Sequence, residues 1–157
     1  MPATDFVRAP GSLPSGVISM LVEGPAFEPL TLDEAKLRAG LAWAAGDPRD
    51  ALMEAFVRAA RQKVEQDTGL ALAEQTRRVV VNVEAGASWP MPAQTVPTQS
   101  ITPEGATARL QPRFGPAGAW TFTETTSGSY LVVAGWPSIE ALQAEAPLLV
   151  HAVGLLV

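Results

Sequence analysis

The distribution of proline and glycine constrains this sequence more than any other feature. The chain contains 14 prolines and 13 glycines, and most of them lie outside residues 31–68. Both residues interrupt regular elements and favour turns. We therefore expect long helical structure within 31–68, and turns, short strands and extended arms over much of the remainder.

Residues 31–68 carry the signals of two helices. The first begins at Thr31-Leu32-Asp33-Glu34, whose spacing matches a capping box, and is expected to end at Gly46-Asp47-Pro48. Leu37 and Leu41 would lie one turn apart on one face of it. The second runs from about Pro48 or Asp50 to Thr68, with Gly69 placed as a left-handed C-cap residue.

The second helix is predicted to bury one apolar stripe, because its apolar residues recur at intervals of three and four. The stripe consists of Leu52, Phe56, Ala59, Ala60 and Val64, flanked by Met53 and Val57. The charged residues that are expected to form its solvated sides are Glu54, Arg58, Arg61 and Glu65.

Strands are predicted on both sides of the helices. The β-branched run from Thr76 to Val83 is typical of a strand, and an apolar patch at 17–22 predicts one strand within an extended N-terminal arm. Short antiparallel strands are expected around 106–110, 120–125 and 130–133. Prolines between Trp89 and Pro97 exclude a central strand there and indicate an edge, a loop or a surface for a partner.

The chain is expected to form one α+β domain. Its 157 residues are about the size of a single domain, and 47% hydrophobic with 17% charged residues suits a packed core. The predicted parts are an arm (1–29), a helical core with the first strand (30–83), a β-rich region (84–137) and a C-terminal helix (138–157). The fold class is a small helical core with a small antiparallel sheet or β-hairpin and extended arms.

The C-terminal helix region, which Pro147 interrupts, ends in an apolar run. Leu148 to Val157 contains a single titratable side chain, His151, so this run is expected to pack in the core or to insert into a partner. We predict an interface from apolar character and position. Its candidate residues are Trp89, Met91, Val96, Leu148, Leu149, Val150, Leu155 and Leu156.

The net charge of the chain argues against sequence-independent binding of nucleic acid. The chain contains 16 acidic residues and 11 lysines and arginines, which gives a formal net charge of −5. Four arginines could form a basic patch, but no aromatic residues are interleaved with them, and pairing with Glu54, Glu65 and Glu74 is the ordinary alternative. These arginines are Arg58, Arg61, Arg77 and Arg78.

Residues that could carry catalysis are scarce. The absence of cysteine excludes thiolate chemistry and disulfides, and the single histidine, His151, is expected to be a core or interface residue. The carboxylate pairs Asp33-Glu34, Glu65-Asp67 and Glu140-Glu145 have simpler structural explanations. No nucleotide-binding or calcium-loop motif is present. We predict no enzyme, cofactor or metal; the sequence indicates neither a signal peptide nor a membrane span, and a soluble cytoplasmic product is expected.

Several blocks of sequence resemble one family. They are Leu30-Thr31-Leu32-Asp33-Glu34-Ala35-Lys36, residues 50–61, residues 64–72 and Glu74-Gln75-Thr76. A capped short helix, a turn, a long alanine-rich helix ending in Thr-Gly and a Gln-Thr strand follow in this order. The chain thereby resembles the head-tail connector, or adaptor, family of long-tailed phages, prophages and phage-like gene transfer agents. The likeness covers 30–83 and, more loosely, 130–136 and the terminal helix.

The resemblance implies a non-enzymatic virion component in the neck of a phage-like particle, assembled in the bacterial cytoplasm. Twelve copies would form a homo-oligomeric ring beneath the portal and extend the DNA channel without sequence-specific binding. The implied partners are the portal protein, which the C-terminal segment would engage, and a tail-proximal stopper or tail-terminator protein. Loops such as 89–97 would contact a neighbouring subunit or the tail.

Two other classes of function remain open from the residues alone. A small soluble protein-binding module would also expose apolar side chains such as Trp89, but would be stable as a monomer. A carboxylate-dependent hydrolase would require a concave pocket with convergent acids, and the single histidine counts against it.

Overall fold

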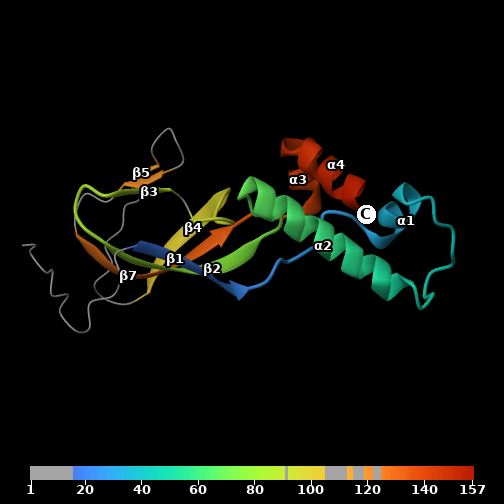
Figure 1. Cartoon of the computed structure of the whole chain (residues 1–157), viewed down its shortest axis with the longest axis horizontal. Helices are drawn as coiled ribbons and strands as arrows, with labels where there is room; N and C mark the ends of the chain where they lie inside the picture. The colour runs from blue at the N-terminus through green and yellow to red at the C-terminus, as the bar shows by residue number, and fades with distance from the viewer. Residues whose placement is uncertain (1–15, 91, 105–112, 115–118, 122–124) are drawn as a thin grey trace, which may run out of the picture.

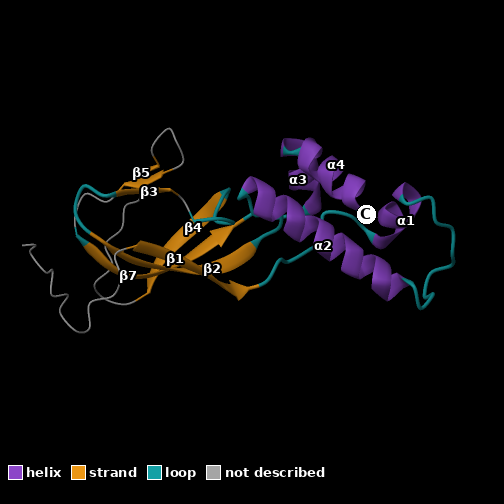
Figure 2. Ribbon diagram, in the orientation of Figure 1, coloured by secondary structure: helices purple, strands orange, loops and turns teal. Residues whose placement is uncertain are grey.

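The computed structural model describes residues 16–90, 92–104, 113–114, 119–121 and 125–157. The molecule is elongated, with a β-sheet at one end and the helices at the other, as Figures 1 and 2 show. This arrangement confirms the predicted α+β class with a small antiparallel sheet.

Four antiparallel strands form the main sheet, in the order β1-β2-β7-β4. They are β1 (Gly16–Glu23), β2 (Gln75–Val83), β7 (Thr126–Ala134) and β4 (Thr98–Glu104). The predicted strands at 17–22, 76–83 and 130–133 lie within β1, β2 and β7. In the described part of the chain, three short strands form a second sheet in the order β3-β6-β5. They are β3 (Ser88–Pro90), β6 (Ala119–Thr121) and β5 (Arg113–Phe114).

One face of the main sheet is buried because the apolar residues of β2 and β7 alternate in step. Val79 lies opposite Tyr130, and Arg77 lies opposite Val132. The odd-numbered residues of β2 and the even-numbered residues of β7 therefore share this face. We call the resulting cluster the sheet core. It consists of Ala71, Val79, Val81, Val83, Tyr130, Val132 and Ala134.

Strand β4 was not predicted, because Pro97 directly before it and Pro103 within it obscured its pattern. It pairs only with β7 among the described strands and therefore lies at a sheet edge, where Pro103 is tolerated. The strand predicted at 106–110 lies outside the described residues, and the one predicted at 120–125 appears in part as β6.

The first helix, α1 (Leu32–Arg38), begins as predicted and ends earlier. Thr31 Oγ1 accepts a hydrogen bond from the Glu34 N–H (3.2 Å), and Glu34 Oε2 accepts one from the Thr31 N–H (2.9 Å). Gly40 adopts a φ of +67°, which ends the helix well before Gly46. The predicted extent was therefore wrong, and Leu37 does not share a helical face with Leu41.

The second helix, α2 (Asp50–Thr68), has the predicted bounds. Gly69 has a φ of +72° and donates its N–H to the Glu65 carbonyl (2.9 Å), which confirms the predicted C-cap. The predicted stripe was wrong in part, because two stripes overlap on this helix and packing selects one. Met53, Val57, Ala60 and Val64 are buried with Arg61 and Glu65, whereas Leu52, Phe56 and Ala59 are exposed.

The C-terminal region forms two short helices, α3 (Ile139–Glu145) and α4 (Pro147–Leu156). They meet at an angle of 107°, and Pro147 begins α4, as its predicted interruption of the helix requires. Helix α4 packs on α2 and closes a second cluster, the helical core. The helical core includes Leu30, Met53, Val57, Val64, Leu72, Trp136, Leu142, Val150 and Val153.

Candidate interaction surfaces

The predicted C-terminal interface residues divide between the surface and the interior. Leu148 is 80% exposed and Leu155 72%, and Leu156 is also exposed. Leu149 is half-buried against the helical core, and Val150 lies inside that core. Val150 is therefore corrected from an interface residue to a core residue, because its helical spacing with Val153 directs both side chains towards the helical core.

Two of the other predicted interface residues, Trp89 and Val96, lie among the described residues. Trp89 is in β3, where its backbone pairs with that of Trp120 in β6, and Met91 lies outside the described residues. Val96 is half-buried, and its carbonyl accepts from the Ala71 N–H (2.7 Å). The structure therefore ties Val96 to the chain's own backbone at the end of α2.

Exposed apolar side chains gather at the helical end on three elements. Leu37 on α1 is 81% exposed, and Leu52 and Phe56 project from the outer stripe of α2. We define the helical apolar surface as these three residues together with the exposed leucines of α4. Its members are Leu37, Leu52, Phe56, Leu148, Leu155 and Leu156. Sequence reasoning missed Leu52 and Phe56, since the same periodicity suits a core stripe.

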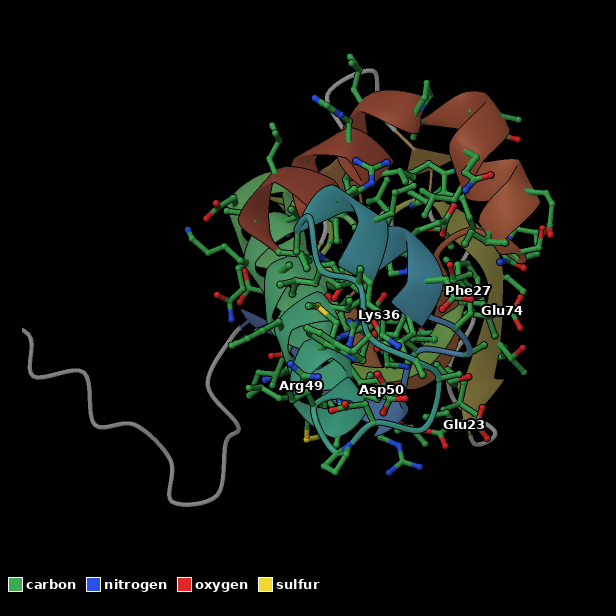
Figure 3. The ribbon with its side chains drawn as sticks, turned by 90° about the vertical axis from the view of Figure 1, so that its right-hand side faces the viewer. Glu23, Phe27, Lys36, Arg49, Asp50 and Glu74 are labelled. Carbon is green, nitrogen blue, oxygen red and sulfur yellow. The ribbon has the colours of Figure 1, made fainter. Side chains whose placement is uncertain are left out.

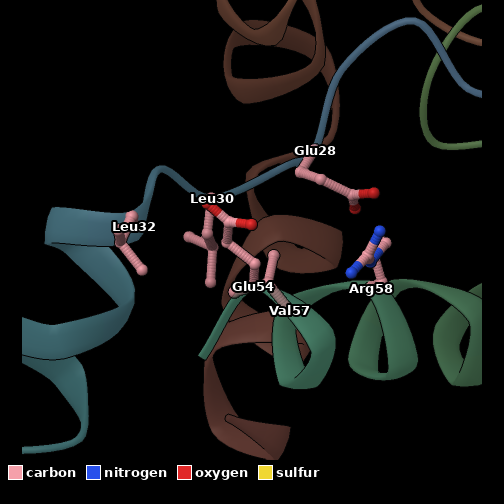
Figure 4. A pocket seen from close by; sticks show the side chains of 6 residues that line it. All are labelled: Glu28, Leu30, Leu32, Glu54, Val57 and Arg58. Carbon is pink, nitrogen blue, oxygen red and sulfur yellow. The ribbon is translucent and has the colours of Figure 1, made fainter. Parts of the chain in front are cut away.

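A hollow of about 300 Å³ lies between α1, α2 and the segment before α1. Leu30, Leu32 and Val57 supply its apolar part, and Glu28, Glu54 and Arg58 supply charged groups, as Figure 4 shows. Among the described residues, two carboxylates and no histidine line it. Its chemistry is that of an apolar depression with a charged rim.

A buried ion network attaches the segment before α1 to α2. The Arg61 guanidinium lies 2.9 Å from Glu28 Oε2 and 2.6 Å from Glu65 Oε2, and Glu65 Oε1 accepts from the Leu72 N–H (2.9 Å). Burial raises the pKa of Glu65, because the carboxylate loses hydration that Arg61 and the Leu72 N–H only partly replace. The network therefore positions the lining of the hollow, and it accounts for two residues that were predicted to face solvent.

Asp50, the first residue of α2, holds the loop that follows α1. Lys36 Nζ lies 2.6 Å from Asp50 Oδ1, Trp43 Nε1 donates to the same oxygen (2.7 Å), and the Gly46 N–H donates to Oδ2 (2.9 Å). Figure 3 shows Lys36, Arg49 and Asp50 at this end of α2. Arg49 lies over the Trp43 ring at 4.3 Å. Lys36 and Trp43 lower the pKa of Asp50.

The predicted carboxylate pairs do not converge on a common centre. Glu34 caps α1, Glu65 serves the buried network, and Asp67 pairs with Lys63 (2.6 Å). Glu145 accepts from Trp136 Nε1 (3.0 Å). Within the described residues no three acidic or histidine side chains are grouped as metal ligands would be.

His151 was expected to be a core or an interface residue. It is exposed on α4, so the core alternative is wrong. It lies between Leu148 and Leu155 in sequence, at the spacing that puts all three on one side of a helix. His151 thus belongs to the same exposed side of α4 as two members of the helical apolar surface.

The arginines of the hypothetical basic patch are dispersed instead of clustered. Arg61 is buried in its ion network, and Arg78 donates to Glu104 across β7 (2.6 Å). Arg77 donates to Ser19 Oγ (2.7 Å) and to Gln94 Oε1 (2.7 Å). Of the expected pairings with Glu54, Glu65 and Glu74, the structure shows Arg61 with Glu65, whereas Arg77 and Arg78 bind other partners.

Over the described ranges, no single helix has the length and apolar content to cross a membrane, although α3 and α4 together meet that test as a pair bent by 107°. Comparison of the chain with protein-family models, curated proteins and solved structures found no match in any of the three.

Proposed function

We propose that this chain is a structural subunit of the head-tail connector kind, which assembles into a ring between portal and tail and extends the DNA channel. The observation that carries the proposal is the helical apolar surface. Leu37, Leu148 and Leu155 are each more than two-thirds exposed, whereas Leu30, Leu72 and Leu142 lie in the helical core. Large exposed apolar side chains in this number at one end of a molecule are typical of interaction sites.

The remaining geometry is compatible with an assembling subunit and offers little to catalysis. The acidic residues that were candidates for acid–base work hold helix ends, buried arginine and surface lysine. The hollow beside α2 has an apolar part made by Leu30, Leu32 and Val57, which suits an apolar side chain of a neighbouring protein. The blocks that resemble the connector family, 30–72, supply α1, α2 and this hollow.

The proposal is tested by light scattering after size exclusion over a range of concentrations, with and without a portal protein of the same particle. We expect a mass near twelve times the 16.5 kDa of the chain, or a complex that forms only with the portal. The variant Leu148→Glu/Leu155→Glu should lose this assembly, because two carboxylates replace apolar contacts. Gln143→Glu is the matched control, since it adds charge at an exposed position of α3 without removing apolar surface.

A strictly monomeric chain that ignores the portal at high concentration would overturn the connector proposal. It would favour a monomeric protein-binding module, which would use the same surface for another partner. Assembly that survives the double substitution would show that the helical apolar surface is not the contact.

A further inference from the structure

The two edges of the main sheet differ in how they are protected against pairing. Edge strand β4 contains Pro103, which has no N–H to donate, and an irregular register between Thr98 and Ser100. Of these two features the proline is the one that opposes the addition of another strand, because it lacks an N–H. Edge strand β1 has neither proline nor lysine, its one charged residue is Glu23 at its end, and its irregular register lies between Leu21 and Glu23 at that same end.

Strand β1 also exposes apolar side chains along its length. Ile18 is 55% exposed, and Met20, Leu21 and Val22 are about half exposed. Ile18 and Met20 lie opposite Val80 and Arg78, on the face away from the sheet core, whereas Val17 lies opposite Val81 on the core side. A further strand would therefore meet apolar residues on both faces of β1. None of the described strands occupies this position.

We propose that β1 pairs antiparallel with β1 of a second copy across a two-fold axis near Ser19, which joins the two four-stranded sheets into one. With the axis at Ser19, Ile18 faces Met20 of the other copy and Val17 faces its Leu21. Opposed residues then share parity, so the faces of both sheets stay continuous. This inference goes beyond the proposed function, since it concerns the sheet end and not the helical end of the molecule.

Charge and edge protection both select a second copy as the occupant. Each copy carries a formal charge of −5, yet residues 16–22 are uncharged, and Glu23 falls outside the paired segment, where it accepts from Thr76 Oγ1 (2.8 Å). Two acidic molecules can therefore approach along β1 without opposed carboxylates. Because Pro103 opposes pairing at β4, a β1–β4 chain of copies does not propagate, and this strand contact joins two copies only.

The absence of cysteine makes a crosslinking test specific. Directly opposed residues in an antiparallel pair have Cα atoms about 4.5–5.5 Å apart, which is within disulfide range. We expect Ser19→Cys to form a reducible covalent dimer under mild oxidation. Thr102→Cys, exposed on the protected edge β4, is the control and should stay uncrosslinked.

A second variant tests the contact without a covalent bond. Ile18→Lys should raise the dissociation constant of the dimer by at least about tenfold, because a charge at an exposed edge position opposes pairing, whereas Thr102→Lys should leave it unchanged. Circular dichroism checks that both variants keep the fold. A monomeric wild-type chain whose Ser19→Cys form does not crosslink, or a dimer that survives Ile18→Lys, would overturn the proposal.

The same variants separate this contact from the proposed ring. Ile18→Lys leaves the helical apolar surface intact, so ring or portal binding should persist in it while the two-fold contact is lost. Leu148→Glu/Leu155→Glu should have the opposite effect. The experiments can therefore contradict either proposal without contradicting the other.

Discussion

At the scale of single residues, burial decides what an ion pair contributes. Helix α2 carries two pairs with the same spacing and the same 2.6 Å distance: Arg61–Glu65, which is buried, and Lys63–Asp67, whose side chains are both 58% exposed. An exposed pair keeps its hydration when it separates, but a buried partner left alone does not. The two pairs therefore form an internal comparison.

We expect Glu65→Ala to lower the free energy of unfolding by about 3 kcal/mol, since it removes one of the two carboxylates paired with the buried Arg61 and leaves the Leu72 N–H without its acceptor. Asp67→Ala should cost about 0.3–0.5 kcal/mol. Urea denaturation of both variants measures the difference. Equal costs would contradict the assigned role of burial.

The Tyr130 hydroxyl is a buried polar group with no hydrogen-bond partner in the described part of the chain. Its burial raises the pKa of the phenol. Tyr130→Phe keeps the ring packing and removes the unpaired group, so we expect a gain of about 1 kcal/mol in unfolding free energy. Chemical denaturation tests this, and a loss of stability would show that the hydroxyl is satisfied.

The Asp50 carboxylate links stability to pH. Lys36 and Trp43 lower its pKa in the folded chain below 3.8, the ordinary value of an aspartate in the unfolded chain. At pH values between the folded pKa and 3.8, the unfolded chain therefore binds more protons than the folded chain. The contribution of Asp50 is present above pH 3.8 and is lost as pH falls through its folded pKa. The stability difference between wild type and Asp50→Asn, measured by denaturation at several pH values, should shrink below about pH 4. A difference that grows on acidification would contradict this sign.

At the scale of elements, two glycines show how a junction differs from a helix end. Both have positive φ, +72° at Gly69 and +101° at Gly135. A Cβ at Gly69 would meet open space, whereas one at Gly135 would lie 2.1 Å from the Ala73 carbonyl oxygen. Gly135 joins β7 to the helical end, where the chain passes closely over residues 73–74.

We expect Gly69→Ala to cost about 1 kcal/mol, from backbone strain alone. Gly135→Ala should cost about 3 kcal/mol or more, because rigid backbone must also move. Thermal and urea denaturation compare the two variants. A Gly135→Ala cost no larger than that of Gly69→Ala would show that the junction is loosely packed.

At the scale of the whole molecule, two cores meet in one short segment. Ala71 belongs to the sheet core and its neighbour Leu72 to the helical core, and the Glu74 N–H donates to the Trp136 carbonyl (2.9 Å) between them. Because adjacent residues anchor both ends of the elongated molecule, the ends should unfold together.

We therefore expect Val132→Ala in the sheet core and Val153→Ala in the helical core to lower one common transition, each by about 2 kcal/mol. Far-UV circular dichroism and tryptophan fluorescence should give coincident curves. Separate transitions, each sensitive to only one substitution, would show two independent folding units.

The sequence by itself determined the local features. The capping box at Thr31, the C-cap at Gly69, the break at Pro147 and the strand at 76–83 follow from hydrogen-bonding capacity, φ preference and β-branching within a few residues. These signals are short-range, so the elements could be predicted with correct type and mostly correct bounds.

Tertiary structure alone decided which faces are buried. Helix α2 carries two apolar stripes of equal periodicity, and the packing of α1, α4 and neighbouring segments on it buries Met53 and Val57 while Leu52 and Phe56 remain exposed. The same packing placed Arg61 and Glu65 inside and divided Leu148 from Val150. Periodicity specifies that a face exists, but the free energy of burial depends on the element packed against it, which lies far away in the chain.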